Sequence, residues 1–371
     1  MPNAIVVGMG GMGSSVAYHL ARAGFQVTGI DRFRPPHDRG SSFGSVRIIR
    51  QAYFEDPRYI PLLKHVYTLW EEVMDQGFPS LFHRAGLLVL SGERDGTVDR
   101  IQSNAQAHGV PIESLSYADV RRRFPQFHMP ESHFGIFEPG AGFLESENCV
   151  QAHFDLAERK GVKFIEVEVR EWSSGPTGVR VKTEKDTLHA DLLFFCAGAW
   201  TESLLGQFGM QLDVRRAPQF WFEPGPGHTE AEGMPCFAFS GGGEFIYGFP
   251  SIDGWGLKAA SYAPSTPIPD LLDTDSHYTR EEIASIARDV EKYLGVNPKP
   301  VRSHICKYTL SRDENFLIGH HPHHANVILA TAGSGHAFKF LPLIGELTAH
   351  IAMGKAPPYD ASFLRFRADV G

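Results

Sequence analysis

The chain has 371 residues, of which 42% are hydrophobic and 21% charged, and its formal net charge is -8 at pH 7. The length favours two domains, and the composition is normal for a globular protein. Because the net charge is acidic and no block of Lys or Arg occurs, we do not expect nucleic acid as a partner.

Neither a membrane segment nor a signal peptide is expected. No apolar run is long enough to span a bilayer, and the N-terminal segment MPNAIVVGMGGMG lacks a charged region and a cleavage site. The cysteines are widely spaced without a CxxC motif, which favours free thiols in a reducing compartment. We therefore expect a cytoplasmic protein without a membrane partner. The cysteines are Cys149, Cys196, Cys236 and Cys306.

The N-terminal segment has the pattern of a strand, a glycine turn and a helix. Residues 4–7 form a short apolar run that is typical of a buried parallel strand, and GMGGMG follows at residues 8–13. A helical pattern continues to Gly24, and a second strand ends at Asp31. This order of elements favours a dinucleotide-binding unit.

The glycines and the acid of this unit have different expected functions. Gly8 would permit the tight turn, Gly10 would let a pyrophosphate approach the backbone, and Gly13 would allow close helix–strand packing. The pyrophosphate would bind the free N–H groups at the helix start. Asp31 would accept hydrogen bonds from ribose hydroxyls. The alternative is a glycine-rich structural turn, and the motif does not distinguish NAD from FAD.

The next segments alternate between helices, loops and strands. A proline-containing loop at 32–40 precedes a helical pattern that includes Trp70, and a strand GLLVL precedes a polar helix near 96–108. Ser116 is a candidate N-cap for another helix. We expect residues 138–172 to form a loop, a helix and a strand.

Two later segments repeat the order strand, glycine turn and helix. They are TLHADLLFFCAGAWTESLL in the middle of the chain and NVILATAGSGHAFKFLPLIGELTAHIAMG near its end. Between them, residues 216–265 contain short aromatic strands typical of an antiparallel sheet, and a helix follows from Thr279. The pattern predicts a nucleotide domain built from separated segments, and an inserted domain that covers a ligand.

Five stretches of the chain resemble monomeric sarcosine oxidase and N-methyltryptophan oxidase, within the D-amino-acid-oxidase-like flavoproteins. They are VVGMGGMG, GSSFGSVRIIRQAYFE, IYGFPSIDGWGLK, ICKYTLSRDENFLIG and GSGHAFKFLPLIGE. The resemblance implies an α/β plus α+β fold: a Rossmann-type FAD-binding domain with an inserted antiparallel-sheet substrate domain. The expected FAD-binding domain comprises residues 1–80, 138–215 and 300–371, and the substrate domain comprises residues 81–137 and 216–299.

The resemblance also implies an activity. A secondary amino acid, N-methylated or cyclic, would be oxidised to the imine with O2 as the acceptor, releasing H2O2. A monomer is expected, with the amine and O2 as its small-molecule partners. Two alternatives stay open: a dehydrogenase or demethylase with another electron acceptor, and a non-catalytic nucleotide-binding sensor.

Cys306 lies in the stretch CKYT. Its residue type and surroundings leave open a buried filler, half of a disulfide, a metal ligand and a reactive thiolate. The resemblance implies a covalent thioether to the 8α-methyl group of FAD, which suits a thiolate nucleophile facing an oxidised flavin. The other three cysteines match no such position and are expected to be structural.

Four charged residues are assigned by the resemblance. Arg50 and Lys339 would bind the substrate carboxylate, for which a guanidinium fork is well suited. Glu55 would orient Arg50, and Arg47 would lie against the flavin. The alternatives are a solvated basic pair for Arg47 and Arg50, and an ordinary exposed helix lysine for Lys339.

Lys258 lies between apolar residues in WGLKAA. The alternative is a strand lysine whose stem is buried and whose head reaches water. The resemblance implies a position over the flavin, facing O2, where a fixed positive charge stabilises the anions that form. Tyr247 and Tyr308 match aromatic residues of the family's substrate pocket, although aromatic residues in strands usually belong to a core.

The chain departs from the family at two positions. Phe43 and Tyr262 occupy places where the family has histidines near the flavin, which puts sarcosine itself in doubt as the substrate. Phe43 and the aromatic stretch from Phe220 to Phe222 favour a bulkier or more apolar amine. The motif GHHPHH at residues 319–324 does not predict a metal, because adjacent histidines rarely point at one centre.

The site implied by the resemblance has two groups of residues. The expected catalytic residues are Lys258, Arg47, Tyr308, Tyr247 and Tyr262. The expected FAD-binding residues are Gly8, Gly10, Gly13, Asp31, Arg32, His37, Gly40, Ser41, Arg47, Gly198, Trp200, Cys306, Gly333, Gly335 and Lys339.

Overall fold

The computed structural model describes residues 1–92, 96–205, 211–241, 243–252, 254–263, 265–268, 270–272 and 277–365. Within these residues the strands form four sheets. No helix in the described part of the chain is long and apolar enough to cross a membrane.

The first sheet has six strands and contains the strands of all three expected strand–glycine–helix units. Five neighbouring strands are parallel, and the edge strand β19 runs antiparallel to β20. In sheet order the strands are β19 (Leu317–His321), β20 (His324–Thr331), β13 (Leu192–Phe195), β1 (Asn3–Val7), β2 (Gln26–Asp31) and β9 (Lys163–Glu166).

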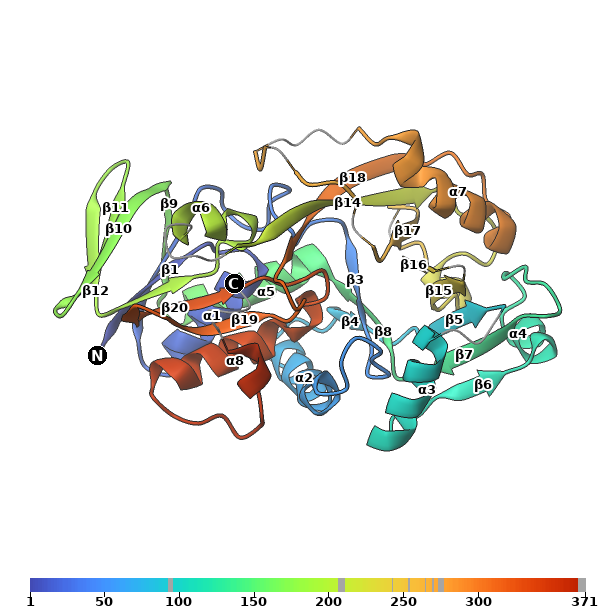
Figure 1. Ribbon diagram of the computed structural model, residues 1–371, viewed down its shortest axis with the longest axis horizontal. Coiled ribbons are helices and arrows are strands. Elements are labelled where there is room, and N and C mark those ends of the chain that lie inside the picture. Colours follow the sequence, from blue (N-terminus) through green and yellow to red (C-terminus); the bar gives the residue numbers. More distant parts are fainter. Residues whose placement is uncertain are drawn as a thin grey trace.

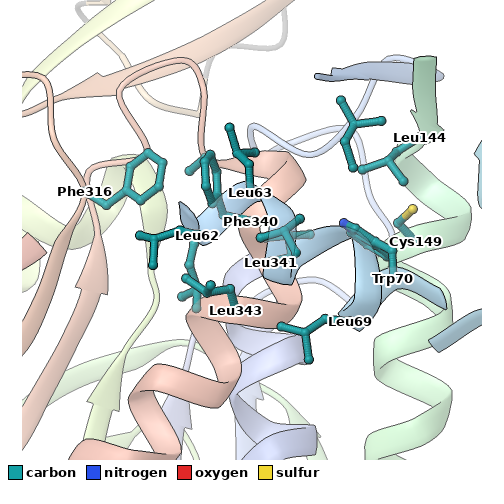
Figure 2. Close-up of a cluster of buried hydrophobic side chains, with 14 of the residues drawn as sticks. Leu62, Leu63, Leu69, Trp70, Leu144, Cys149, Phe316, Phe340, Leu341 and Leu343 are labelled. Atoms are coloured by element: carbon teal, nitrogen blue, oxygen red, sulfur yellow. The ribbon is translucent and has the colours of Figure 1, made fainter. Parts of the chain in front are cut away.

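Helices cover one face of this sheet. Because β1 is buried on both faces, Ala4 and Val6 pack with the helices, while Ile5 and Val7 join the core on the opposite face. The helices are α1 (Gly11–Arg22), α2 (Tyr59–Met74), α5 (Ser146–Arg159) and α8 (Leu341–Ala352). Figure 2 shows the core where leucines and Trp70 of α2 meet Phe340 and Leu341 at the start of α8.

Two three-stranded sheets complete this part of the molecule. Strands β10 (Val169–Gly175), β11 (Gly178–Thr183) and β12 (Thr187–Ala190) contribute to the core on the opposite face of the six-stranded sheet. Strand β8 (Gly142–Glu145) pairs with β3 (Val46–Ile49) and β4 (Phe82–His83). Residues 142–145 were expected to be a loop and are a strand instead, because β3 and β4 supply hydrogen-bonding partners on both sides.

The fourth sheet has eight strands and is antiparallel except for the parallel pair β5 and β15. In sheet order the strands are β18 (Arg302–Leu310), β14 (Asp213–Phe222), β17 (Leu257–Ser261), β16 (Glu244–Phe249), β15 (Cys236–Gly241), β5 (Leu87–Ser91), β7 (Phe134–Glu138) and β6 (Glu113–Leu115).

Three helices accompany this sheet, and side-chain caps begin two of them. Ser116 caps α4 (Tyr117–Arg123) and Thr279 caps α7 (Arg280–Leu294), each in a reciprocal capping box, and α3 (Gly96–His108) lies between β5 and β6 in sequence. The shorter elements are η1 (Gly198–Trp200), α6 (Thr201–Leu205), η3 (Glu230–Glu232), η4 (Phe338–Phe340) and η5 (Ser362–Leu364).

The two large sheets occupy different ends of the molecule. Figure 1 shows β1, α1 and α8 toward one end, β5 to β7 with α3 and α4 toward the other, and the long pair β14 and β18 between them. The eight-stranded sheet takes β18 and the first residues of β14 from segments assigned above to the FAD-binding domain. The division into two domains stays a prediction.

Candidate functional site

A continuous cavity lies at the carboxyl ends of the parallel strands. Its wall includes Gly8 after β1, Asp31 at the end of β2, Ala197 after β13 and Gly333 after β20. In open α/β sheets, ligands bind outside the carboxyl ends of the strands. The position of the cavity is therefore that of a cofactor site.

The three glycines of the first motif differ in what surrounds them. Gly8 has φ +88°, and a Cβ there would lie 2.5 Å from the Cys196 carbonyl oxygen. A Cβ on Gly13 would lie 1.7 Å from the Gly8 carbonyl oxygen, so this glycine allows the helix to pack on the strand. Gly10 lines the cavity, and a Cβ there would meet no protein atom within 4 Å. The space beside Gly10 therefore fits a pyrophosphate that approaches the backbone at the start of α1.

Asp31 is held at the rim of the same cavity. One carboxylate oxygen accepts a hydrogen bond from the Met9 N–H at 2.7 Å, and the other accepts one from the Phe33 N–H at 3.2 Å. Burial raises the pKa of Asp31, and the Met9 N–H opposes that shift. A carboxylate fixed at the end of the second strand fits the ribose of a dinucleotide.

Most of the expected FAD-binding residues meet in this cavity. Gly13 and Lys339 do not line it: Gly13 packs between strand and helix, and Lys339 belongs to a second cluster described below. The expected residues that line the cavity are Gly8, Gly10, Asp31, Arg32, His37, Gly40, Ser41, Arg47, Gly198, Trp200, Cys306, Gly333 and Gly335.

Cys306 lies on β18 in the wall of the cavity and is 2% exposed. Its Sγ is 3.8 Å from Nη2 of Arg47 and 3.6 Å from the Ser41 carbonyl oxygen. All four cysteines are free thiols, and burial raises the pKa of the other three. The disulfide alternative for Cys306 is therefore excluded in this structure, and a guanidinium stands beside the thiol.

Three of the expected catalytic residues, Lys258, Tyr247 and Tyr308, share one face of the eight-stranded sheet, whereas Arg47 lies on β3 in another sheet. Lys258 is opposite Trp221, Cys306 is opposite Ala217, and Tyr247 is opposite Ala260 in the strand register. Side chains alternate between the faces of a strand, so Cys306 and Tyr308 point to the same side. The hydroxyls of Tyr247 and Tyr308 are 3.3 Å apart.

The alternation corrects one expectation. Phe220 and Phe222 flank Trp221 and therefore point to the opposite face, where they join a core with Ile286 and Val290 of α7. These two aromatic residues cannot shape a pocket on the Lys258 face. The expectation was wrong because a continuous aromatic run does not show which residues face the site.

Lys258 is buried between the sheet and the loop before β3. Its Nζ donates hydrogen bonds to the carbonyl oxygens of Gly44 at 2.5 Å and Val46 at 3.0 Å. The ammonium also lies 5.2 Å from the ring centre of Trp221. Burial lowers the pKa of Lys258 well below its usual value, and repulsion from Arg47 lowers it further.

Arg47 is held by the same loop and lines the cavity. Its Nη2 donates to the carbonyl oxygens of Ser41 at 3.0 Å and Phe43 at 2.6 Å, and its Nη1 donates to Val46 at 2.9 Å. The carbonyl oxygens of residues 41–46 therefore hold two cations, Arg47 of β3, which lines the cavity, and Lys258 of β17.

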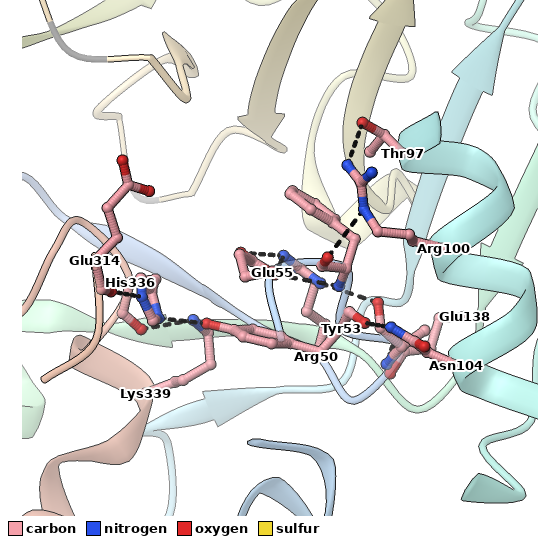
Figure 3. A network of polar contacts seen from close by, with 12 residues as sticks. Arg50, Tyr53, Glu55, Thr97, Arg100, Asn104, Glu138, Glu314, His336 and Lys339 are labelled. Carbon is pink, nitrogen blue, oxygen red and sulfur yellow. Dashed lines mark hydrogen bonds and ion pairs between the residues drawn. The ribbon is translucent and has the colours of Figure 1, made fainter. Parts of the chain in front are cut away.

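A second cluster is centred on Arg50. Its Nη2 donates to both oxygens of Glu55, at 2.6 and 2.7 Å, and its Nη1 donates to the Ala52 carbonyl oxygen at 2.9 Å. The guanidinium carbon lies 4.5 Å from the ring centre of Tyr53 and 4.4 Å from that of Phe54. Burial acts to raise the pKa of Glu55, but attraction to Arg50 prevails and lowers it. Figure 3 shows this cluster together with Lys339 and His336.

Lys339 lies in η4, immediately before α8. Its Nζ donates to the His336 carbonyl oxygen at 2.8 Å and lies 5.2 Å from the ring centre of Tyr53. Burial and repulsion from Arg50 lower the pKa of Lys339 to about 7. Two buried cations, Arg50 and Lys339, therefore lie close to the Tyr53 ring.

Several residues of these clusters were not expected from the sequence. The Tyr53 hydroxyl forms a hydrogen bond with Nδ1 of His336 at 2.6 Å, and Nε2 of His336 forms one with the Glu314 carbonyl oxygen at 3.0 Å (Figure 3). The neighbours of Arg50 in the sequence could have identified Tyr53 and Phe54, because a buried guanidinium needs aromatic or acidic cover.

A further aromatic group adjoins the Arg50 cluster. The rings of Phe54, Phe245 and Tyr262 are mutual neighbours, with centres 5.1, 5.6 and 6.2 Å apart. Tyr262 also interacts with the Glu55 carboxylate. The position of Phe245 could have been predicted from its strand, because Phe245 is two residues from Tyr247 on β16 and therefore points to the same face.

Gln219 and His304 were missed on the Cys306 face. They are opposite each other in the strand register, two pairs away from Cys306 and Ala217. Among the described residues, Oε1 of Gln219 and Nε2 of His304 have no hydrogen-bond partner. The period of two residues from Cys306 is the signal that could have found His304.

The cavity, its glycines and its carboxylate define a dinucleotide-dependent protein. The chain matches the family model described as FAD dependent oxidoreductase over residues 3–351, and it belongs to this family. It is 36% identical over 358 residues to a monomeric sarcosine oxidase of Streptomyces avermitilis, covering 94% of this chain and 93% of the relative. It is 30% identical to an N-methyl-L-tryptophan oxidase of Salmonella heidelberg, covering 97% of each chain.

A solved structure supports the fold. The open form of NikD, an unusual amino acid oxidase essential for nikkomycin biosynthesis, has a TM-score of 0.85 at 22% identity and covers 98% of each chain. The predicted fold class, the family resemblance and an FAD-dependent oxidoreductase are therefore confirmed.

Proposed function

We propose that the chain oxidises a secondary amino acid, N-methylated or cyclic, to the imine with O2 as the acceptor, releasing H2O2. One observation carries this proposal. Arg50 and Lys339 both lie close to the Tyr53 ring, and Lys339 follows Phe338, which lines the cofactor cavity. Two buried cations next to a flavin site suit a substrate that has a carboxylate.

The residues of the chain bind and orient the amine. Arg50, held by Glu55, and Lys339 bind the carboxylate. Tyr247 and Tyr308 line the pocket on the side of the eight-stranded sheet. FAD, when bound, would accept a hydride equivalent from the carbon next to nitrogen, while the nitrogen gives up its proton. The amine then leaves as an imine, and one O2 takes up two electrons and two protons to give H2O2.

The aromatic group beside Arg50 supports a substrate more apolar than sarcosine. Phe54, Phe245 and Tyr262 would contact the side chain or the N-substituent of an amino acid whose carboxylate binds Arg50. The named relatives act on one small and one aromatic N-methyl amino acid, sarcosine and N-methyl-L-tryptophan. This group takes the place of the wrongly assigned Phe220 and Phe222.

An amine screen tests the activity directly. The purified protein is incubated in air with sarcosine, N-methyl-L-phenylalanine, L-proline and L-pipecolate, and H2O2 is measured with a peroxidase-coupled dye. Production of H2O2 from at least one of them, absent for the matched N-acetyl compounds, is expected. If an amine were oxidised only when an artificial electron acceptor was present, the dehydrogenase alternative would be favoured. If no amine reduced the flavin, the proposal would be contradicted.

Cys306 is proposed to hold FAD covalently, and acid precipitation tests this. The yellow colour of the wild-type protein is expected in the acid pellet, and Cys306→Ala is expected to release it into the supernatant. Cys196→Ala is the matched control, because Cys196 is a second buried thiol in the wall of the same cavity. Yellow in the supernatant of the wild type would contradict a covalent link.

Lys339 is expected to make carboxylate binding depend on pH. Its pKa of about 7 means that it is charged below pH 7 and loses its charge as the pH rises through this value. The Kd of propionate, which has no amine to oxidise, should rise at least about tenfold from pH 6 to pH 9, since a charge-assisted hydrogen bond is lost. The measurement is a titration of the flavin absorbance.

A control variant separates Lys339 from its neighbours. The pKa of Glu55 is lowered and that of His336 is about 4, so neither titrates in this range, and those of Tyr53 and Tyr262 are raised. Lys339→Met should therefore bind propionate weakly at every pH. A profile with the same slope in Lys339→Met would show that another group is responsible.

A further inference from the structure

The turn from Gly44 to Val46 is a carbonyl cradle for Lys258. Gly44 and Ser45 have positive φ values of +112° and +65°. The carbonyl oxygens of Gly44 and Val46 accept hydrogen bonds from Nζ of Lys258 at 2.5 and 3.0 Å. A serine rarely adopts this left-handed backbone, so the turn persists only where its surroundings hold it.

Glu147 is the carboxylate that holds this turn, beside the Ser146 N–H, which donates to the Ser45 carbonyl oxygen at 2.8 Å, and the Trp221 ring N–H, which donates to the Ser45 hydroxyl at 3.3 Å. One carboxylate oxygen accepts hydrogen bonds from the N–H groups of Gly44 at 2.9 Å and Ser45 at 3.2 Å. The other accepts the Ser146 hydroxyl at 2.6 Å. Glu147 also lies in the first turn of α5, where a negative charge is favoured. These contacts lower the pKa of Glu147 despite its burial, so the carboxylate is ionised.

The charges around Lys258 come from several elements. Arg47 on β3 disfavours its ammonium form, whereas Glu147 on α5 and Cys306 on β18 favour it. Lys258 in turn contributes to lowering the pKa of His304 on β18 to about 4. The rings of Trp221 and Phe249 provide further cover. Among the described residues that act on Lys258, Glu147 is the carboxylate that favours its ammonium form against repulsion from the half-buried Arg47.

We propose that Glu147 is the positioning residue of the Lys258 site. Through the Gly44–Val46 turn it fixes the two carbonyl oxygens that hold Nζ, and its carboxylate supplies the negative charge that keeps this buried lysine protonated. The inference deepens the proposed function, on which it rests for the reaction with O2. Glu147 contacts the loop and acts on that reaction through Lys258.

Two variants separate position from charge. Glu147→Gln keeps an acceptor for the Gly44 and Ser45 N–H groups and removes the charge. Glu147→Asp keeps the charge but is one methylene too short to reach the turn, and it preserves an acidic residue at the start of α5. Glu138→Gln is the matched control, because Glu138 is a buried carboxylate that accepts the Gln51 and Ala52 N–H groups away from Lys258.

The first readout needs no turnover. The protein is labelled with 13C-lysine, and the Lys258 Cε signal, identified by its absence in Lys258→Met, is titrated by NMR. Glu147→Gln should move the midpoint of this titration to lower pH, whereas Glu138→Gln should not. An unchanged midpoint in folded Glu147→Gln overturns the inference. If Glu147→Gln does not fold, an unchanged Lys258 signal in Glu147→Asp overturns it.

The second readout is the reaction of the reduced protein with O2. At pH 8 the rate constant should fall at least about tenfold in Glu147→Gln, with a smaller deficit at lower pH, where Lys258 regains its proton. Anaerobic reduction by the amine should be unchanged. A deficit that is equal at every pH would indicate a merely structural effect and would overturn the charge argument. If the wild type does not react with O2, the proposed function fails, while the NMR titration still decides whether Glu147 controls Lys258.

Discussion

Lys258→Met is expected to slow the reaction of the reduced protein with O2 by roughly 10²–10³-fold, as for the loss of one preorganised electrostatic group. Reduction of O2 develops negative charge, and Lys258 presents a cation fixed by the Gly44 and Val46 carbonyl oxygens in a buried site. The measurement is stopped-flow mixing of anaerobically reduced protein with O2.

Three controls make this result specific. The rate of anaerobic reduction by the amine should stay close to that of the wild type, because Lys258 lies away from the Arg50 cluster. Turnover with an artificial acceptor should also persist. Lys258→Arg keeps the charge but fits the carbonyl cradle poorly, so an intermediate rate is expected. Reoxidation of Lys258→Met at an unchanged rate would remove Lys258 from the proposed function.

The nucleotide-binding half of the site follows from local patterns. Each strand–glycine–helix unit is contiguous in sequence, and the strands β1, β13 and β20 become neighbours in one sheet. The glycine spacing also predicted the geometry, with Gly8 at positive φ and Gly13 against the Gly8 carbonyl. This half of the site could therefore be predicted, because its geometry depends on steric contacts between residues that are close in sequence.

The second half of the site depends on contacts that no local pattern shows. Strand β5 pairs in parallel with β15, which lies far along the chain, and β8 finds partners in β3 and β4. The pairing partner and register decide which side chains meet, so Gln219 and His304 become neighbours only in the folded sheet. Long-range register is a property of the whole sheet rather than of one strand.

The four cations of the site could be assigned from the family resemblance but not from a sequence pattern. Arg47, Arg50, Lys258 and Lys339 have no spacing that brings them together, and the resemblance alone assigned them to one site. The structure adds what the resemblance did not contain: carbonyl oxygens hold Lys258 and Arg47, while a carboxylate holds Arg50. This difference in partners favours separate tasks for Lys258 and Arg50.

Arg50→Met is expected to weaken carboxylate binding by about 100-fold, the range for loss of a charge-assisted hydrogen-bonding group. The same change should lower the free energy of unfolding by about 3–5 kcal/mol, because it leaves the Glu55 carboxylate buried without its partner. Propionate titration measures the binding, and urea unfolding measures the stability. A variant that bound propionate as tightly as the wild type would exclude Arg50 as the anchor.

The double variant Arg50→Met/Glu55→Gln separates these two effects. An uncharged amide in place of Glu55 removes the unpaired charge, so part of the lost stability should return while propionate binding stays weak. Glu55→Gln alone should keep Arg50 charged and bind propionate more tightly than either Arg50 variant. If the double variant recovered binding together with stability, Arg50 would act on the substrate only through folding, and Lys339 would be the remaining anchor.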